Sequence, residues 1–253
     1  MRSIFNSSGF SFRIVMRTLL ILLCISAGTA SVCYAGVLSQ KEETTVSADI
    51  EPQETISEQI IAEKLAEELI QTAVQVEPEI TAVLVSLESE NARLVGLEHR
   101  IKSKESLSRK ILADAHDMEV SLEEAAGTIG DVLRYTLCID EELYIPTVEN
   151  ALKTLEENHI SVIKFKNRWG GEGYKGINTN LKTENGLILE LQLHTPASFE
   201  AKELEHANYE IARSETSTEE EKKAAAALAI EIYAKVPVPE GSPEYVWEIK
   251  PDN

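Results

Sequence analysis

The chain has 253 residues, of which 26% are charged, and its formal net charge at pH 7 is −19. Such an excess of negative charge excludes DNA as a partner, because affinity for long nucleic acids comes largely from neutralised phosphates. Binding of a single nucleotide in a locally basic pocket is still compatible with this net charge.

The first 35 residues have the pattern of an export signal. A short apolar run at Leu19–Ile25 follows basic residues, and small residues lead to cleavage after Ala35 or Ala30. The run is shorter than the roughly 20 apolar residues that a membrane helix needs. We therefore expect a secreted or periplasmic protein without stable membrane association after cleavage. A retained N-terminal anchor and a lipoprotein at Cys33 are the alternatives.

Signal cleavage after Ala35 would leave Cys138 as the one cysteine of the mature chain. This excludes an intrachain disulfide and a cysteine-based zinc site. Its apolar neighbours indicate a small core residue.

The remaining chain divides by composition into a flexible acidic segment, an N-terminal helical part, one domain and a tail. The helical part consists of two amphipathic helices that pack on the core, with a partner-binding arm as the alternative. The predicted boundaries are 36–52, 53–95 (helices 55–75 and 79–95), 96–236 and 237–253.

Within the domain, helical and alternating patterns follow one another, and Asn185-Gly186 between apolar runs predicts a hairpin turn. Ser106 is expected to cap the first helix. The predicted helices are 106–115, 146–158, 198–214 and 218–234, and the predicted strands are 132–139, 160–165, 175–181 and 187–193. We predict an α+β (mixed α/β) fold, with a central mixed sheet of about five strands flanked by helices.

The segment 187–194 alternates leucines with other residues, so Leu189, Leu191 and Leu193 share one face of a strand. Glu190 and Gln192 then lie on the opposite face, together with His194. Such polar groups need partners or a function if the strand is central. A solvated face of an edge strand is the alternative.

A basic run precedes and enters the first domain helix. Arg100 and Lys102 come before the helix start, and Lys110 follows Ser106 by one turn on the same helix face. Together they could bind several phosphates, although a charge run can also be a solvated surface.

Asp131 follows a glycine and precedes a strand, and paired with Glu190 it could hold Mg²⁺. A simple turn former is the alternative for Asp131. Tyr174 stands among glycines and could stack on a base, or belong to the core. Lys164, Lys166 and Arg168 alternate just before it and could add positive charge for a second nucleotide.

Over about residues 93–213 these segments resemble the synthetase domain of the RelA/SpoT family. The resemblance is carried by the ATP-site pattern, the metal-binding aspartate, the glycine–tyrosine turn, the glutamate–x–glutamine strand with its threonine, and a later glutamate and histidine. In this chain these are Arg100, Lys102, Ser106, Lys110, Asp131, Gly173, Tyr174, Glu190, Gln192, Thr195, Glu203 and His206.

The resemblance implies a pyrophosphokinase that moves the β,γ-pyrophosphate of ATP to a nucleotide 3′-hydroxyl. Asp131 and Glu190 would hold Mg²⁺, and Glu190 would also take the proton of the attacking hydroxyl. ATP would be bound by Arg100, Lys102, Ser106 and Lys110, and the purine nucleotide acceptor by Tyr174, Gln192, Lys166, Arg168, Lys175 and His206.

Three positions depart from the family pattern, all on the acceptor side. Thr136 replaces an arginine, Glu172 replaces the turn asparagine and Asn178 replaces a histidine. With its export signal, the chain looks similar to secreted nucleotide 3′-pyrophosphokinases. The alternatives are a toxin of the same fold acting on the tRNA 3′ end, and an inactive nucleotide-binding relative. The chain has no Gly-x-Ser-x-Gly elbow and no Walker-type loop. The oligomeric state is left open.

Overall fold

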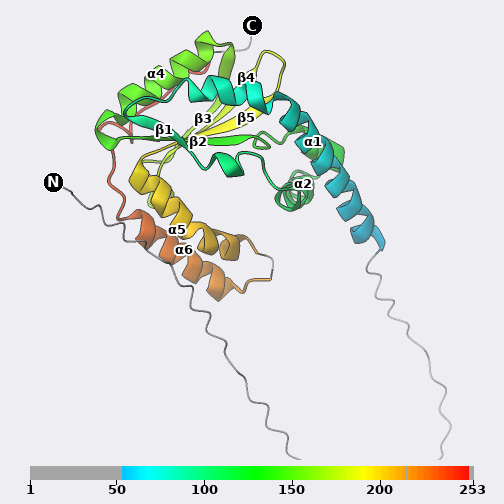
Figure 1. Cartoon of the computed structure of the whole chain (residues 1–253). Helices are drawn as coiled ribbons and strands as arrows, with labels where there is room; N and C mark the ends of the chain where they lie inside the picture. Colours follow the sequence, from blue (N-terminus) through cyan, green and yellow to red (C-terminus); the bar gives the residue numbers. More distant parts are fainter. Residues whose placement is uncertain (1–52, 215, 251–253) are drawn as a thin grey trace, which may run out of the picture. The chain divides into compact units, whose positions relative to one another are not determined.

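The computed structural model describes residues 53–214 and 216–250, which belong to one compact unit (Figure 1). The predicted export signal at 1–35 and the acidic segment at 36–52 lie outside the described residues.

The described part combines six α-helices with one five-stranded sheet of order β1-β2-β5-β4-β3. Strands β2 and β5 are parallel, whereas every other neighbouring pair is antiparallel. This confirms the predicted α+β fold with a mixed central sheet. The strands are β1 Ala92–Val95, β2 Arg134–Ile139, β3 Ile160–Asn167, β4 Ile177–Thr183 and β5 Ile188–His194. The helices are α1 Gln53–Val85, α2 Lys104–Met118, α3 Leu122–Gly127, α4 Tyr144–Glu157, α5 Pro196–Arg213 and α6 Glu219–Tyr233, with 3-10 turns at Leu97–His99 and Glu141–Leu143.

The two faces of the sheet are covered by different helices. α4 lies on one side, and α5 with α6 lies on the other (Figure 1). The α4 side is apolar, because alternate residues of β2 and β5, such as Leu137 and Leu191, are fully buried there. The Tyr144 hydroxyl of α4 also donates a hydrogen bond to the carbonyl of Leu193, at 2.7 Å.

Strand β5 lies in the middle of the sheet, between β2 and β4. Its leucines at 189, 191 and 193 are fully buried, as the alternation predicts. The alternative of an edge strand with a solvated polar face is therefore wrong.

The N-terminal part differs from the prediction of two helices. α1 is a single helix of 33 residues that continues through Pro78, and residues 92–95 form β1 rather than the end of a helix. Proline removes only one hydrogen bond, and buried α1 residues on both sides of it, such as Ala73 and Leu84, keep the helix against the core. Leu94 is buried as a strand residue, since β1 pairs with β2.

The start of α2 is also different from the prediction. Ser103 is the N-cap, and its side chain accepts a hydrogen bond from the Ser106 backbone N–H, so Ser106 lies inside the first turn. The short helix α3 was not predicted. Its capping box, formed by Ser121 and Glu124, is a signal that the sequence does contain.

The predicted hairpin between β4 and β5 is confirmed. The Thr183 backbone N–H donates to the Leu187 carbonyl at 3.0 Å, and Gly186 adopts a φ of 81° that favours glycine. None of the helices in the described ranges is long and apolar enough to span a bilayer.

Candidate active site

The candidate site occupies the polar face of the sheet, on the side of α5. The parallel register of β2 and β5 places Arg134 opposite Glu190 and Thr136 opposite Gln192. On the other side of β5, the antiparallel register adds Asn180 next to Glu190. Partners in register share a face, so Glu190 lies between a guanidinium and an amide in the middle of the sheet.

A carboxylate with two lysines lies just before β2. Lys102 Nζ is 2.6 Å from Asp131 Oδ2, and Lys110 Nζ is 3.6 Å from Asp131 Oδ1. The Lys102 backbone N–H donates to the Val132 carbonyl, which ties this segment to the start of β2. The structure therefore brings together three of the residues that the sequence assigns to ATP and metal binding.

The environment of this cluster keeps Asp131 ionised. Only 14% of the Lys102 side chain and 17% of the Asp131 side chain are exposed. Burial alone would raise the pKa of Asp131, but Lys102, Lys110 and Arg134 together hold it below its ordinary value.

Glu190 has the opposite electrostatic environment. Burial raises the pKa of Glu190, and the negative charge of Asp131 raises it further, against the opposing effect of Arg134. Two nearby carboxyl groups whose pKa values are pushed apart are typical of sites that divide acid–base work. Asp131 is suited to hold charge, and Glu190 is suited to exchange a proton.

These two carboxylates are also the groups that could hold a metal ion. The buried Oδ1 of Asp131 accepts no hydrogen bond from the residues described and has only the longer ion pair with Lys110, so it could serve as a ligand. Carboxylate oxygens suit a hard cation such as Mg²⁺. The described residues contain no cluster of three or more histidine, cysteine, aspartate or glutamate residues with metal-site geometry, so substrate and water would have to supply the other ligands.

Half-buried Tyr174 and fully buried His194 form a pair near the end of β5. The Tyr174 hydroxyl lies 2.7 Å from His194 Nε2 and donates to Asn178 Oδ1 at 2.6 Å. His194 Nδ1 is 2.8 Å from Ser198 Oγ, so both ring nitrogens are engaged. Burial lowers the pKa of His194 to about 3, and the imidazole is neutral near pH 7. The Tyr174 ring makes an edge contact with Tyr233 of α6.

The exposed cations of β3 share the polar face with this site. Lys164 and Lys166 pair in register with Asn180 and Asn178, and Arg168 follows them. Repulsion by Lys164, with burial and Arg168 adding to it, lowers the pKa of Lys166. Together they form a positively charged edge that is separated from Gln192 and Glu190 by the asparagines of β4.

Four predicted residues lie outside these clusters. Ser106 lies in the first turn of α2, where its backbone N–H donates to the Ser103 side chain. Arg100 is bound to Glu77 of α1, and it donates to the Leu97 carbonyl at 2.6 Å. Lys175 is buried and donates to loop carbonyls, including that of Trp169 at 3.1 Å. His206 is exposed on α5.

Two charged residues of the polar face were not selected from the sequence. Arg134 begins β2 and stands between Leu133 and Tyr135, which are both buried. This alternation in the sequence indicated that Arg134 lies on the polar face of the sheet. Lys202 follows Ser198 by four residues on α5, and Ser198 is fully buried. A lysine on the buried side of a helix is unusual enough to mark a site.

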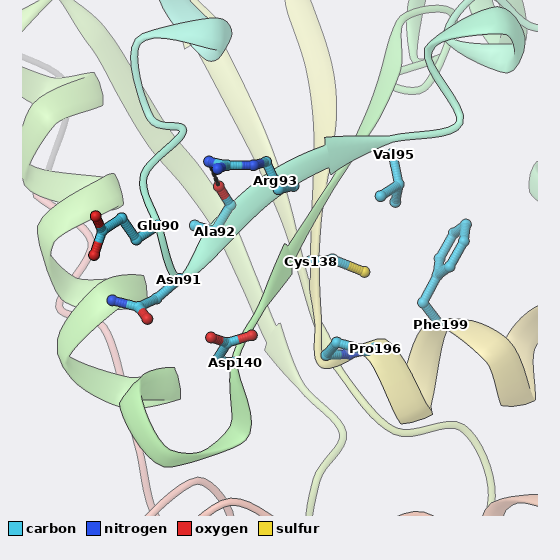
Figure 2. A pocket seen from close by; sticks show the side chains of 9 residues that line it. All are labelled: Glu90, Asn91, Ala92, Arg93, Val95, Cys138, Asp140, Pro196 and Phe199. Atoms are coloured by element: carbon cyan, nitrogen blue, oxygen red, sulfur yellow. Dashed lines mark hydrogen bonds between the residues drawn. The ribbon is translucent and has the colours of Figure 1, made fainter. Parts of the chain in front are cut away.

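A cavity of about 320 Å³ opens on the same side of the sheet, at the β1 edge. Figure 2 shows Cys138 from β2 and Phe199 from α5 facing it, with Val95 and Arg93 on β1. Cys138 is therefore half-buried at a cavity wall, rather than a sealed core residue as predicted. Burial raises the pKa of its thiol to about 11.

No family model and no curated protein matches the chain. Among solved structures, it is similar to a chain in the complex of the Type VI effector Tas1 with its immunity protein, at 20% identity and a TM-score of 0.44, covering 68% of this chain and 95% of that one. A GTP pyrophosphokinase family protein from Streptococcus pneumoniae is 17% identical with a TM-score of 0.41, covering 72% and 87%. The small alarmone synthetase 1 from Bacillus subtilis, bound to pppGpp, is 16% identical with a TM-score of 0.40, covering 66% and 91%.

Proposed function

We propose that this protein is a secreted pyrophosphokinase that transfers the β,γ-pyrophosphate of ATP to the 3′-hydroxyl of a purine nucleotide. The observation that carries the proposal is the pair Asp131 and Glu190, whose pKa values are shifted in opposite directions, with Lys102 at hydrogen-bond distance from Asp131 and Lys110 within ion-pair distance of it. The motif resemblance of the sequence supports the reaction type.

In this reaction the acceptor 3′-oxygen attacks the β-phosphorus of ATP. A new oxygen–phosphorus bond forms, the bond from the β-phosphorus to the oxygen that bridges to the α-phosphorus breaks, and AMP leaves with that oxygen. Lys102 and Lys110 bind the phosphates and offset the charge that develops on them. Glu190 takes the proton of the 3′-hydroxyl, because its raised pKa makes it a stronger base than an ordinary carboxylate.

Mg²⁺ bound by Asp131 and Glu190 would supply additional neutralisation of phosphate charge. This requires Asp131 to exchange part of its contact with Lys102 for the cation. Lys102 would then be released toward the phosphates. Chelation of divalent cations should abolish transfer, and added Mg²⁺ should restore it.

The acceptor would lie toward Tyr174 and the cations of β3. Gln192 is buried, and its Oε1 accepts no hydrogen bond from the described residues, so it could accept one from a substrate hydroxyl. The exposed row of Lys164, Lys166 and Arg168 favours a second candidate function, in which the acceptor is the 3′ end of a tRNA.

The decisive experiment uses the purified chain with γ-labelled ATP, Mg²⁺ and a panel of acceptors. The panel contains AMP, ADP, ATP, GMP, GDP, GTP and total tRNA, and Glu190→Gln is assayed in parallel. We expect label on the 3′-position of a free purine nucleotide, with loss of transfer but retained ATP binding in the variant. Label on tRNA alone would replace the main proposal by the second candidate. Binding of ATP without transfer to any acceptor would identify an inactive relative.

Secretion is a separate part of the proposal and is supported by the pattern of residues 1–35. Expression of the full chain in a bacterium should place activity outside the cytoplasm. Activity confined to the cytoplasmic fraction would refute this part alone.

A further inference from the structure

Lys202 is a cation that neither the fold nor the reaction above accounts for. It extends from the side of α5 that packs toward the sheet, and only 23% of its side chain is exposed. Its closest carboxylate is that of Glu203, at 3.8 Å, and its ammonium lies 5.3 Å from the Phe199 ring centre. Within the described residues, the ammonium donates no hydrogen bond.

The charged group of the sheet that acts most strongly on Lys202 is also positive. Arg134 stands on β2 opposite Glu190, and its guanidinium makes no hydrogen bond or ion pair in the described part of the chain. Burial lowers the pKa of Lys202, and repulsion from Arg134 lowers it further, with Glu203 and Glu190 opposing. Neither cation donates a hydrogen bond to Glu190 or Glu203 in the described residues. Spare cationic donors at a largely buried position are costly, so the arrangement points to an anionic ligand.

The position of Lys202 relates it to the acceptor rather than to ATP. A row of aromatic contacts joins it to Tyr174: the Tyr174 and His194 ring centres are 5.2 Å apart, and those of His194 and Phe199 are 6.3 Å apart. Phe199 in turn lies under the Lys202 ammonium. The lysines that contact Asp131 come instead from α2 and the segment before it.

We infer that Lys202 and Arg134 form a phosphate subsite that binds the 5′-phosphate of the acceptor nucleotide. The inference rests on the proposed function in naming the bound nucleotide as the acceptor. Phosphate binding by the subsite can be measured without any transfer reaction. It makes the protein selective for nucleotides over nucleosides. It also supplies positive charge from α5 and β2, whereas Thr136, which replaces the arginine of the family pattern, supplies none.

The test measures binding in the absence of transfer. Dissociation constants are determined for GMP, AMP, guanosine, adenosine and a non-transferable ATP analogue with a methylene group between the α- and β-phosphates. The variants are Lys202→Met, Lys202→Arg and, as a matched control, Lys223→Met, since Lys223 is an exposed lysine on α6.

We expect the wild-type chain to bind at least one monophosphate at least tenfold more tightly than its nucleoside. Lys202→Met should remove most of this difference without weakening the nucleoside or the ATP analogue. Lys202→Arg should retain the difference, and Lys223→Met should have no effect. The melting temperature of Lys202→Met should be unchanged or higher, because the variant removes a largely buried cation whose ammonium donates no hydrogen bond in the described residues.

Equal binding of nucleotide and nucleoside by the wild type would overturn the inference. So would an equal loss of both in Lys202→Met, which would indicate a structural role, or a loss confined to the ATP analogue, which would assign Lys202 to the donor. Phosphate-selective binding without pyrophosphate transfer to any acceptor would refute the proposed function while leaving the subsite intact.

Discussion

Glu190 shows how the reactivity of one residue depends on its position in the sheet. Its register partners are Arg134 and Asn180, and Asp131 lies near enough to act on it electrostatically. The cations around Asp131 stabilise its ionised form, whereas burial and Asp131 destabilise that of Glu190. Two carboxylates in one site are therefore suited to different tasks, Asp131 to holding negative charge and Glu190 to exchanging a proton.

The first prediction concerns the pH dependence of transfer. Because Glu190 must be ionised to accept the hydroxyl proton and its pKa is raised, kcat/KM should fall as the pH falls through a value above 4.5, the ordinary pKa of the group. A pH–rate profile at subsaturating Mg²⁺ measures this limb, because bound Mg²⁺ would itself lower the pKa of Glu190. An acid limb at or below pH 4.5 would show that another group controls the rate.

The second prediction concerns stability and His194. Its pKa is about 3 in the folded chain against 6.5 for an ordinary histidine, so the unfolded chain binds more protons between these values. The stabilisation is fully present above pH 6.5 and is lost as the pH falls toward 3, on the order of 5 kcal/mol in total. Urea unfolding at several pH values should show this slope, and His194→Gln should flatten it. His206→Gln is the matched control, because that histidine is exposed. An unchanged slope in His194→Gln would contradict the assignment.

At the scale of elements, α1 holds the start of the domain in place. Glu77 of α1 binds Arg100, and its carboxylate also accepts a hydrogen bond from Thr81. Thr81 reaches the hydroxyl of Tyr135 on β2, at 2.8 Å. The arrangement lowers the pKa of Glu77, mainly through the hydrogen bond from Arg100. α1 is therefore tied to the segment that precedes α2 and to the central sheet, in addition to its apolar packing.

The third prediction tests this packing. Leu84 of α1 is fully buried, so Leu84→Ala should lower the free energy of unfolding by about 2–5 kcal/mol. Ile60 lies on the same helix but is 63% exposed, and Ile60→Ala should change stability by less than about 0.5 kcal/mol. Denaturant unfolding of both variants compares them directly. Equal effects would mean that the C-terminal half of α1 is not part of the core.

At the scale of the whole molecule, charge is distributed unevenly. The chain carries a net charge of −19, yet Lys102, Lys110, Arg134 and Lys202 gather near Asp131 and Glu190. A small polyphosphate can enter such a local positive region, whereas a long polyanion also meets the negative remainder.

The fourth prediction follows from this distribution. Raising the salt concentration from about 50 to about 200 mM should weaken ATP binding by less than about a hundredfold, because few phosphates are neutralised. At the higher salt, total tRNA should compete poorly with a free nucleotide acceptor. Competition binding at both salt concentrations measures the two effects. Tight tRNA binding that is lost when Lys164, Lys166 and Arg168 are replaced by glutamine would instead support the tRNA candidate.

Local sequence patterns alone determined much of this protein. The alternation in 187–194 identifies the buried leucine face of β5, Asn185-Gly186 identifies the hairpin, and periodicity locates α2, α4, α5 and α6 to within a few residues. These features depend on backbone preferences and on side chains a few positions apart, which neighbouring residues encode directly.

Only the tertiary structure decided which of these groups meet. The parallel pairing of β2 with β5 brings Arg134 to Glu190, α5 brings Lys202 toward both, and Glu77 binds Arg100 from 23 positions away. The local pattern likewise did not predict β1 or the continuous α1. Leu94 belongs to a strand because β1 pairs with β2, and α1 continues through Pro78 because it packs on distant segments. Strand order, burial and the resulting pKa shifts depend on packing between segments far apart in the chain, and no local pattern records such packing.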